Sequence, residues 1–413
     1  MSEAGGEGVA GANASNATAA SPEGQALAYS SLYLMAIFCI YMGSLRSVVF
    51  VRKHKKEGTK IENSIGWKDA KWFPITASCV LFGLYCVFKH GELIASYITM
   101  AISFAANVTG NATGAVAGLS LKTLLTKENF GYVLLVLICY EGCFALSQLL
   151  KPAVTHILRL LPISQDSDIA QNLPYELLFT KAKSKGSLER AELVKWEWDT
   201  HDMCSLALCS LVGVYHIYAR HWISNDVIGV AFSLYGIENL HLSSFKGGVM
   251  LLAGLFVYDV FWVFATEVMT TVATSVKAPI LLQFPQDLMV NGILAQKHAM
   301  LGLGDIVIPG IFLALLLRFG CNEDESGQER KGGSRRIYFY VTMLGYCAGL
   351  FLTIGIMHYF KAAQPALLYL VPACIGAPLA LAAIRGELSD LWNFSEEHLV
   401  KEEKKEDKDK KTN

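Results

Sequence analysis

Residues 247–264 have the sequence GGVMLLAGLFVYDVFWVF, in which Asp259 is the one acidic or basic side chain. An apolar run close to about 20 residues long can cross the hydrocarbon core of a bilayer as a helix. A carboxylate within such a run costs several kcal/mol to bury, so it marks a functional site by default. The stretch therefore predicts a membrane-spanning helix with Asp259 as a candidate functional residue.

Similar apolar runs recur along the chain of 413 residues, of which 53% are hydrophobic and 17% charged, with a mean hydropathy of +0.37. This composition disfavours a soluble fold, and the formal net charge of -1 gives no support for nucleic-acid binding. We predict an all-α polytopic membrane protein with about nine transmembrane helices, because unpaired backbone groups cannot be left in hydrocarbon. The stretch 93–106 is ambiguous, and the expected spans are residues 29–51, 72–88, 130–150, 203–218, 223–238, 247–267, 298–317, 337–359 and 365–384.

The distribution of Lys and Arg predicts the orientation in the membrane. If the N-terminus is outside, 27 of the 35 cations fall in segments that face the cytoplasm, where cations accumulate. Sequons of the form Asn-x-Ser/Thr can be glycosylated only on the lumenal side. Four of them fall where this orientation requires, at Asn13, Asn16, Asn107 and Asn111.

The C-terminal end of the chain carries the dilysine Lys410-Lys411. Lysines at the fourth and third positions from a cytoplasmic C-terminus resemble an endoplasmic-reticulum retrieval signal. A solvated charged tail is the alternative interpretation. We expect a multi-pass protein of the endoplasmic-reticulum membrane, with a lumenal N-terminus and a cytoplasmic C-terminus.

A second intramembrane carboxylate, Asp305, lies in the sequence LGLGDIVIP of residues 301–309. Thirteen residues separate Lys246 from Asp259, and thirteen separate Asp305 from Arg318. At a rise of 1.5 Å per residue, both carboxylates lie about 20 Å from the same membrane face. The two helices run in opposite directions, so the spacing predicts that the two carboxylates are level.

Two carboxylates a few ångströms apart can share a proton, as in an aspartic protease. The ionised carboxylate takes a proton from the attacking water, and the protonated one donates a hydrogen bond to the developing oxyanion. This chemistry requires neither a metal nor a cofactor, and the ten cysteines form no cluster with metal-ligand spacing.

Several residues near the carboxylates are candidates for supporting roles. Gly302 and Gly304 lack side chains, so a substrate backbone can approach Asp305 closely. The hydroxyl of Tyr258 is a candidate for orienting water or a carboxylate, with packing as the alternative role. The ninth span opens with Gln364-Pro365-Ala366-Leu367, whose proline makes the start of the helix irregular, and irregular backbone at membrane depth borders a cavity or buried protein.

The motifs Tyr258-Asp259, GLGD at 302–305 and QPAL at 364–367, in this order, resemble those of the aspartyl intramembrane proteases, and within them most closely the signal peptide peptidases, with presenilins more distant. The resemblance implies that Asp259 and Asp305 form the catalytic pair. It implies that Pro365, Ala366 and Leu367 shape the active site and grip the substrate. The implied partners are the lipid bilayer and the substrates, which are leftover signal peptides and type II membrane segments; homo-oligomer formation is left open.

This interpretation divides the chain into four regions and leaves two alternatives. An ion-coupled or proton-coupled transporter would explain the paired carboxylates but not the GxGD and Pro-Ala-Leu motifs together. A membrane scaffold that does not cut has no distinguishing mark in the sequence. The expected regions are a disordered lumenal tail (1–28), helices one to five with their loops (29–246, including a candidate glycosylated lumenal insert at 96–128), a catalytic membrane region (247–388) and a charged cytoplasmic tail (389–413).

Overall fold

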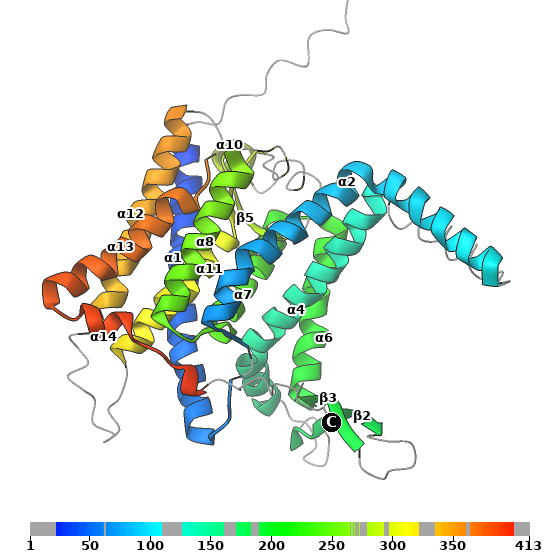
Figure 1. Ribbon diagram of the computed structural model, residues 1–413, viewed down its shortest axis with the longest axis horizontal. Coiled ribbons are helices and arrows are strands. Elements are labelled where there is room, and N and C mark those ends of the chain that lie inside the picture. Colours follow the sequence, from blue (N-terminus) through cyan, green and yellow to red (C-terminus); the bar gives the residue numbers. More distant parts are fainter. Residues whose placement is uncertain are drawn as a thin grey trace, which may run out of the picture.

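The computed structural model shows a bundle of long helices (Figure 1). Of the predicted glycosylation sites, Asn107 lies in the helix α2, whereas Asn13, Asn16 and Asn111 lie outside the described residues, as do Lys410 and Lys411. The described residues are 22–61, 63–109, 126–160, 171–182, 190–264, 266, 268, 272, 279–292, 297–321, 335–360 and 364–399.

Each of the nine predicted spans overlaps one long helix in the described part of the chain. Seven of these helices are long and apolar enough to cross a membrane by length and composition, which confirms the all-α polytopic membrane fold. The other two are α7 and α11. The nine helices are α1 (Pro22–Glu57), α2 (Trp67–Thr109), α4 (Lys127–Leu160), α6 (Thr200–Ala219), α7 (Trp222–Asn239), α8 (Phe245–Phe264), α11 (Gly304–Gly320), α12 (Ile337–Phe360) and α13 (Leu367–Arg385).

Helix α11 lies at the centre of the bundle, in contact with α1, α7, α8, α12 and α13 (Figure 1). Thirteen of its 17 residues are buried, including every residue from Ile311 to Gly320. A helix that is apolar all round is stable when protein surrounds it on every side. Gly310 lets α7 approach, because a Cβ at this position would lie 2.5 Å from Cδ1 of Ile237.

The stretch 93–106, whose structure was ambiguous in the sequence, is part of helix α2. The helix continues through it to Thr109, with a kink at His90, where the backbone has φ -126° and ψ 20°. Figure 1 shows the part of α2 beyond the kink extending away from the bundle. At the N-terminus, α1 begins at Pro22. Its first residues therefore fall within residues 1–28, the region expected to be a disordered tail.

Three two-stranded sheets accompany the helices in the described residues. The strands β2 and β3 form an antiparallel hairpin, as do β5 and β6, whereas β1 and β4 pair in parallel. Short helical segments complete the described structure. These elements are β1 (Ser64–Ile65), β2 (Pro174–Ala182), β3 (Arg190–Asp199), β4 (His241–Leu242), β5 (Leu281–Pro285), β6 (His298–Gly302), α10 (Leu288–Asn291), α14 (Leu388–Trp392) and a 3-10 turn at Glu397–Leu399.

The β5–β6 hairpin corrects the prediction of one helix over 298–317. Residues His298–Gly302 form a strand, and α11 begins only at Gly304. The register pairs Leu281 with Gly302, and the N–H of Leu303 donates to the carbonyl oxygen of Ile280 across 3.1 Å. The hairpin thus pairs its own backbone groups, which allows a non-helical backbone inside the bundle.

Candidate functional site

Asp259 lies on α8, fifteen residues along a helix whose other side chains beyond Lys246 are uncharged. The helix packs on α2 and α13, and the side chain of Asp259 is buried, with 7% of the residue exposed. Because desolvation of an ionised carboxylate is costly, a buried one requires hydrogen-bond donors close by.

The donor is the backbone at the start of α13. The N–H of Leu367 donates to Oδ2 of Asp259 across 3.0 Å. Leu367 is the first residue of α13, and the N–H groups of the first helical turn have no partner within the helix. Pro365 is buried beside it, and the hydroxyl of Tyr369 donates to Oε1 of Gln364 across 3.3 Å. The predicted QPAL segment therefore lies directly against Asp259.

Asp305 lies at the junction between β6 and α11, in the first turn of the helix. A carboxylate is favoured there by the helix dipole and by the unpaired N–H groups. Gly302, the last residue of β6, lies beside it: a Cβ at position 302 would be 3.1 Å from Oδ2 of Asp305. At Gly304 the nearest atom to an added Cβ would be Cδ1 of Ile308 at 4.0 Å, so that side is open.

The two carboxyl groups belong to one site. Helix α8, which carries Asp259, contacts helix α11, which carries Asp305, and the two side chains are close enough for their charges to interact. In the described structure, Asp259 lies on a continuous helix from Lys246, and Asp305 lies on a continuous helix to Arg318. The equal spacing of thirteen residues on each helix therefore still applies. The structure brings Asp259, Asp305, Gly302 and the QPAL segment together.

Tyr258, a candidate for orienting water or a carboxylate, has mainly apolar surroundings. Its ring packs against Trp262, with the ring centroids 6.4 Å apart, and it contacts a cluster of buried apolar side chains around Leu135. Within the described residues its hydroxyl has no hydrogen bond to either carboxylate. The structure thus favours packing as its role.

Two further polar residues at the site were missed in the sequence, and both lie in the predicted span 223–238. Asp226 is buried, and its Oδ1 accepts a hydrogen bond from the backbone N–H of Gln283 across 2.8 Å. The amide of Asn225 donates to the carbonyl oxygen of Leu281 across 2.6 Å. Both hold strand β5 on α7 and so position the hairpin that leads to Asp305.

Tyr346 is a third residue whose contact at the site was not indicated by the sequence. This fully buried residue of α12 donates its hydroxyl hydrogen to the backbone carbonyl of Asp305 across 3.2 Å. A buried tyrosine usually needs such a partner. The sequence can therefore predict that the hydroxyl of Tyr346 has a partner, but it cannot predict that the partner is the carbonyl oxygen of Asp305.

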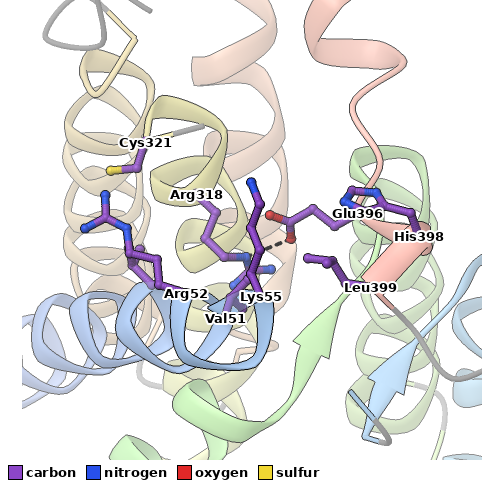
Figure 2. Close-up of a pocket in the computed structure, with 9 residues that line it drawn as sticks. Val51, Arg52, Lys55, Arg318, Cys321, Glu396, His398 and Leu399 are labelled. Atoms are coloured by element: carbon purple, nitrogen blue, oxygen red, sulfur yellow. Dashed lines mark hydrogen bonds and ion pairs between the residues drawn. The ribbon is translucent and has the colours of Figure 1, made fainter. Parts of the chain in front are cut away.

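A buried ionic cluster links the opposite end of the two aspartate-bearing helices. Oε2 of Glu396 accepts hydrogen bonds from Nε of Arg318 and Nε2 of His241, each across 2.9 Å. Arg318 also donates through Nη1 to Oγ of Ser47 on α1 across 2.7 Å and through Nη2 to the carbonyl oxygen of Leu242 across 3.1 Å. The cluster thereby joins the C-terminal segment to α1, to the end of α11 and to strand β4, which precedes α8; Figure 2 shows the bond from Arg318 to Glu396.

The chemistry of the site is that of carboxyl groups. Within the described residues, no group of three or more His, Cys, Asp or Glu side chains could hold a metal ion. All ten cysteines are free thiols.

Comparison with known proteins identifies the family. The family model described as Signal peptide peptidase matches residues 56–398. The chain is 44% identical to Intramembrane protease 2 of Caenorhabditis elegans, over 97% of this chain and 98% of that protein. It is 41% identical to Signal peptide peptidase of Homo sapiens and of Mus musculus, over 93% of this chain and 87% of each relative. No solved structure matches. The chain therefore belongs to the signal peptide peptidase family of intramembrane proteases.

Proposed function

We propose that this protein is an aspartyl intramembrane endopeptidase in which Asp259 and Asp305 activate water. The observation that carries the proposal is the hydrogen bond from the N–H of Leu367 to Asp259, together with the contact between α8, which carries Asp259, and α11, which carries Asp305. These contacts gather all three sequence motifs at one point of the bundle. A purely structural role for either carboxylate would not explain that convergence.

In the proposed reaction, the two carboxyl groups share one proton. The ionised carboxylate accepts a proton from water as the water oxygen attacks the carbonyl carbon of the scissile amide. The protonated partner donates a hydrogen bond to the carbonyl oxygen as negative charge develops there. Leu367 holds Oδ2 of Asp259, which leaves Oδ1 free to face the water. Collapse of the tetrahedral intermediate then breaks the C–N bond, and the carboxyl group that took the proton from water gives it to the leaving amine.

The surroundings suit an extended peptide. Gly302 carries no side chain beside Asp305, and Gly304 is open to the exterior of the helix. A transmembrane substrate must be unwound before its amides can be attacked, because a helical amide is shielded by its own hydrogen bonds. We propose remnant signal peptides and type II membrane segments as substrates; the name of the human relative, Signal peptide peptidase, supports the first of these.

We place the activity in the endoplasmic-reticulum membrane, with the N-terminus lumenal and the C-terminus cytoplasmic. The uneven distribution of cations supports this orientation, and the dilysine Lys410-Lys411 supports the location. Membership of a protease family argues against the transporter alternative, because paired carboxylates are the only feature that favours a transporter.

Single substitutions test the mechanism. We expect Asp259→Ala and Asp305→Ala each to lower cleavage of a type II signal-peptide substrate by detergent-solubilised protein at least 100-fold, the low end of about 10²–10⁴ for acid–base catalysis. The isosteric variants Asp259→Asn and Asp305→Asn should lose activity equally while the thermal unfolding midpoint is kept. As a control, Glu397→Gln changes an exposed acidic residue and should cleave normally. Undiminished cleavage in either aspartate variant would reject the proposal.

A further inference from the structure

The β2–β3 hairpin lies outside the helix bundle, beyond the start of α6 (Figure 1). Apart from pairing with each other, its strands pack chiefly on α6 within the described structure. An isolated two-stranded hairpin is at best marginally stable in water. We therefore expect something beyond the described helices to cover one of its faces.

The two faces of the hairpin differ in composition. Successive residues of a strand belong to opposite faces, and residues paired across an antiparallel ladder share a face. Up to the register shift after Phe179, the positions on one face are all apolar or aromatic: Tyr175, Leu177, Phe179, Val194, Trp196 and Trp198. The positions on the other face are Glu176, Leu178, Lys195 and Glu197, three of which are charged. The hairpin is thus amphipathic.

The apolar face is accessible in the described structure. Tyr175 is 38% exposed and Leu177 is 40% exposed, and Trp198, which pairs with Tyr175 in the register, is half-buried. Contiguous apolar surface of this kind marks an interaction site more often than chance exposure does. The accessible face therefore requires an occupant that can cover aromatic and aliphatic side chains together.

The base of the hairpin is fixed to two helices that are long and apolar enough to cross a membrane, α4 and α6. Nζ of Lys151 on α4 forms ion pairs with Oδ2 of Asp199 across 3.1 Å and with Oδ2 of Asp202 across 2.8 Å. The backbone N–H of Thr200 donates to the carbonyl oxygen of Leu173 across 3.1 Å. These bonds hold the hairpin where α6 begins.

The bilayer surface lies at the same place. The predicted span in α6 starts at residue 203, and α6 itself starts at Thr200, which is about 4.5 Å earlier along the helix. The headgroup layers extend about 5–8 Å beyond each side of the ~30 Å hydrocarbon core. Tryptophan and tyrosine are enriched at this depth, because their rings are apolar and their N–H or O–H groups are polar. The base of the hairpin therefore falls within the headgroup layer.

We propose that the apolar face of the β2–β3 hairpin docks on the lipid bilayer, in the headgroup layer on the side where α6 begins. Tyr175, Leu177 and Trp198 enter this layer, and the face with Glu176 and Glu197 stays in water. Residues 174–199 contain five basic and five acidic residues, so the hairpin has no net charge. Burial of apolar surface carries the contact, and a bilayer of zwitterionic lipid is sufficient.

Photo-crosslinking of the full-length protein in phosphatidylcholine nanodiscs tests the contact. The photoreactive residue p-benzoylphenylalanine replaces either Leu177 or Leu178, and lipid adducts are measured by mass spectrometry of the intact protein. The two leucines are a matched pair, because they are neighbours with similar exposure, 40% and 44%, on opposite faces. We expect at least about five-fold more lipid adduct at position 177 than at position 178, since only one face meets the bilayer.

Further positions guard against a hairpin disturbed by the probe. The same comparison between Tyr175 and Glu176 repeats the test one pair of residues closer to α6, and position 175 should give the higher lipid yield. Val214 on α6 is 65% exposed within a predicted membrane span and serves as the positive control for lipid labelling. Equal lipid yields on the two faces, or none at 175 and 177 while position 214 is labelled, would overturn the proposal.

The same samples distinguish the bilayer from the other possible occupants. Adducts at position 177 with a second copy of the chain would assign this face to an interface between copies and overturn the proposal. The lipid yield at 177 should not change when the ionic strength is raised, because salt screens charges and not apolar contacts. A yield that falls with salt would mean that charge attracts the hairpin, and it would also overturn the proposal. No cleavage is measured, so failure here leaves the protease proposal intact.

Discussion

The backbone N–H of Leu367 donates a hydrogen bond to Oδ2 of Asp259 across 3.0 Å, although the two residues lie 108 positions apart in the chain. The bond satisfies two groups at once, the unpaired N–H at the start of α13 and a carboxylate buried on α8. It therefore determines how the two helices meet. It also explains in physical terms why a proline-containing helix start lies next to the proposed catalytic residue.

Removal of this N–H alone should slow the reaction. Replacement of Leu367 by leucic acid converts its backbone amide to an ester and keeps the side chain. A hydrogen bond to a charged group contributes about 1.5–3 kcal/mol, and each 1.36 kcal/mol is a factor of ten. We expect kcat to fall about 10- to 100-fold, measured at saturating substrate.

The same ester at Leu368 is the matched control. The N–H of Leu368 donates to the carbonyl oxygen of Pro365 across 3.2 Å and does not contact Asp259. This variant weakens the same helix start but leaves the carboxylate contact in place. Equal losses of kcat in the two esters would assign the effect to the helix start and not to Asp259.

The membrane helices and the two aspartates could be predicted from the sequence, because the length of an apolar run and the chemistry of a side chain are visible there. Asp259 and Asp305 stand out because ionisable groups are rare in apolar runs, and their equal spacing from Lys246 and Arg318 depends only on helix geometry. Asp226 is likewise an ionisable residue within an apolar run, the span 223–238. Its contact with Gln283, however, depends on how the β5–β6 hairpin folds back onto α7.

Other features had no sequence signal that could reveal them. A short apolar run such as HAMLG at 298–302 fits a strand or a buried helical segment equally well, so its periodicity could not exclude a helix. The bond from Leu367 uses a backbone N–H, which every residue except proline has. Its partner depends on tertiary packing, and no residue type marks it.

A methyl group at Gly302 should disturb Asp305. The Cβ of Gly302→Ala would lie 3.1 Å from Oδ2 of Asp305, so the carboxylate must move by a few tenths of an ångström. A misplacement of about 1 Å costs about 100-fold in rate, and we expect a loss of about ten-fold in kcat for this smaller shift. The assay is cleavage of the same signal-peptide substrate at saturation.

Gly355→Ala is the control for this substitution. Gly355 lies on α12, and a Cβ there would meet no atom within 4 Å. Its kcat should equal that of the unaltered protein. Full activity in Gly302→Ala would show that Asp305 tolerates crowding on this side.

The ionic cluster at Glu396 should contribute strongly to stability. Glu396→Gln leaves the charge of Arg318, a residue only 4% exposed, without its partner carboxylate. Removal of one member of a buried ion pair costs about 3–5 kcal/mol. We expect a clear decrease in the thermal unfolding midpoint in detergent.

Two further variants separate the loss of charge from the loss of packing. Glu397→Gln alters the exposed neighbour and should leave the midpoint unchanged. Arg318→Met/Glu396→Leu removes both charges and should recover much of the stability, because apolar residues can replace a buried pair. A Glu396→Gln midpoint equal to that of Glu397→Gln would contradict a stabilising role.

His241 should make the stability depend on pH. Burial lowers the pKa of His241 below 6.5, with Arg318 and His54 acting in the same direction and the hydrogen bond to Glu396 opposing them. The unfolded chain, whose histidine has a pKa of about 6.5, then binds the proton more readily than the folded chain. Stability is therefore highest above about pH 6.5 and declines as the pH falls toward the pKa of the folded state.

The carboxylate of the same cluster acts in a lower range. Burial opposes the charged form of Glu396, but Arg318 and His241 outweigh it, so its pKa lies below its usual value of about 4.5. Its contribution is lost only as the pH falls below that value. Thermal midpoints between pH 8 and 5.5 thus include the contribution of His241, and we expect the midpoint to decrease across this range. His241→Gln, which keeps a neutral donor for Glu396, should flatten that decrease, whereas His156→Gln, an exposed position on α4, should preserve it. An unchanged slope in His241→Gln would place the pH dependence elsewhere in the chain.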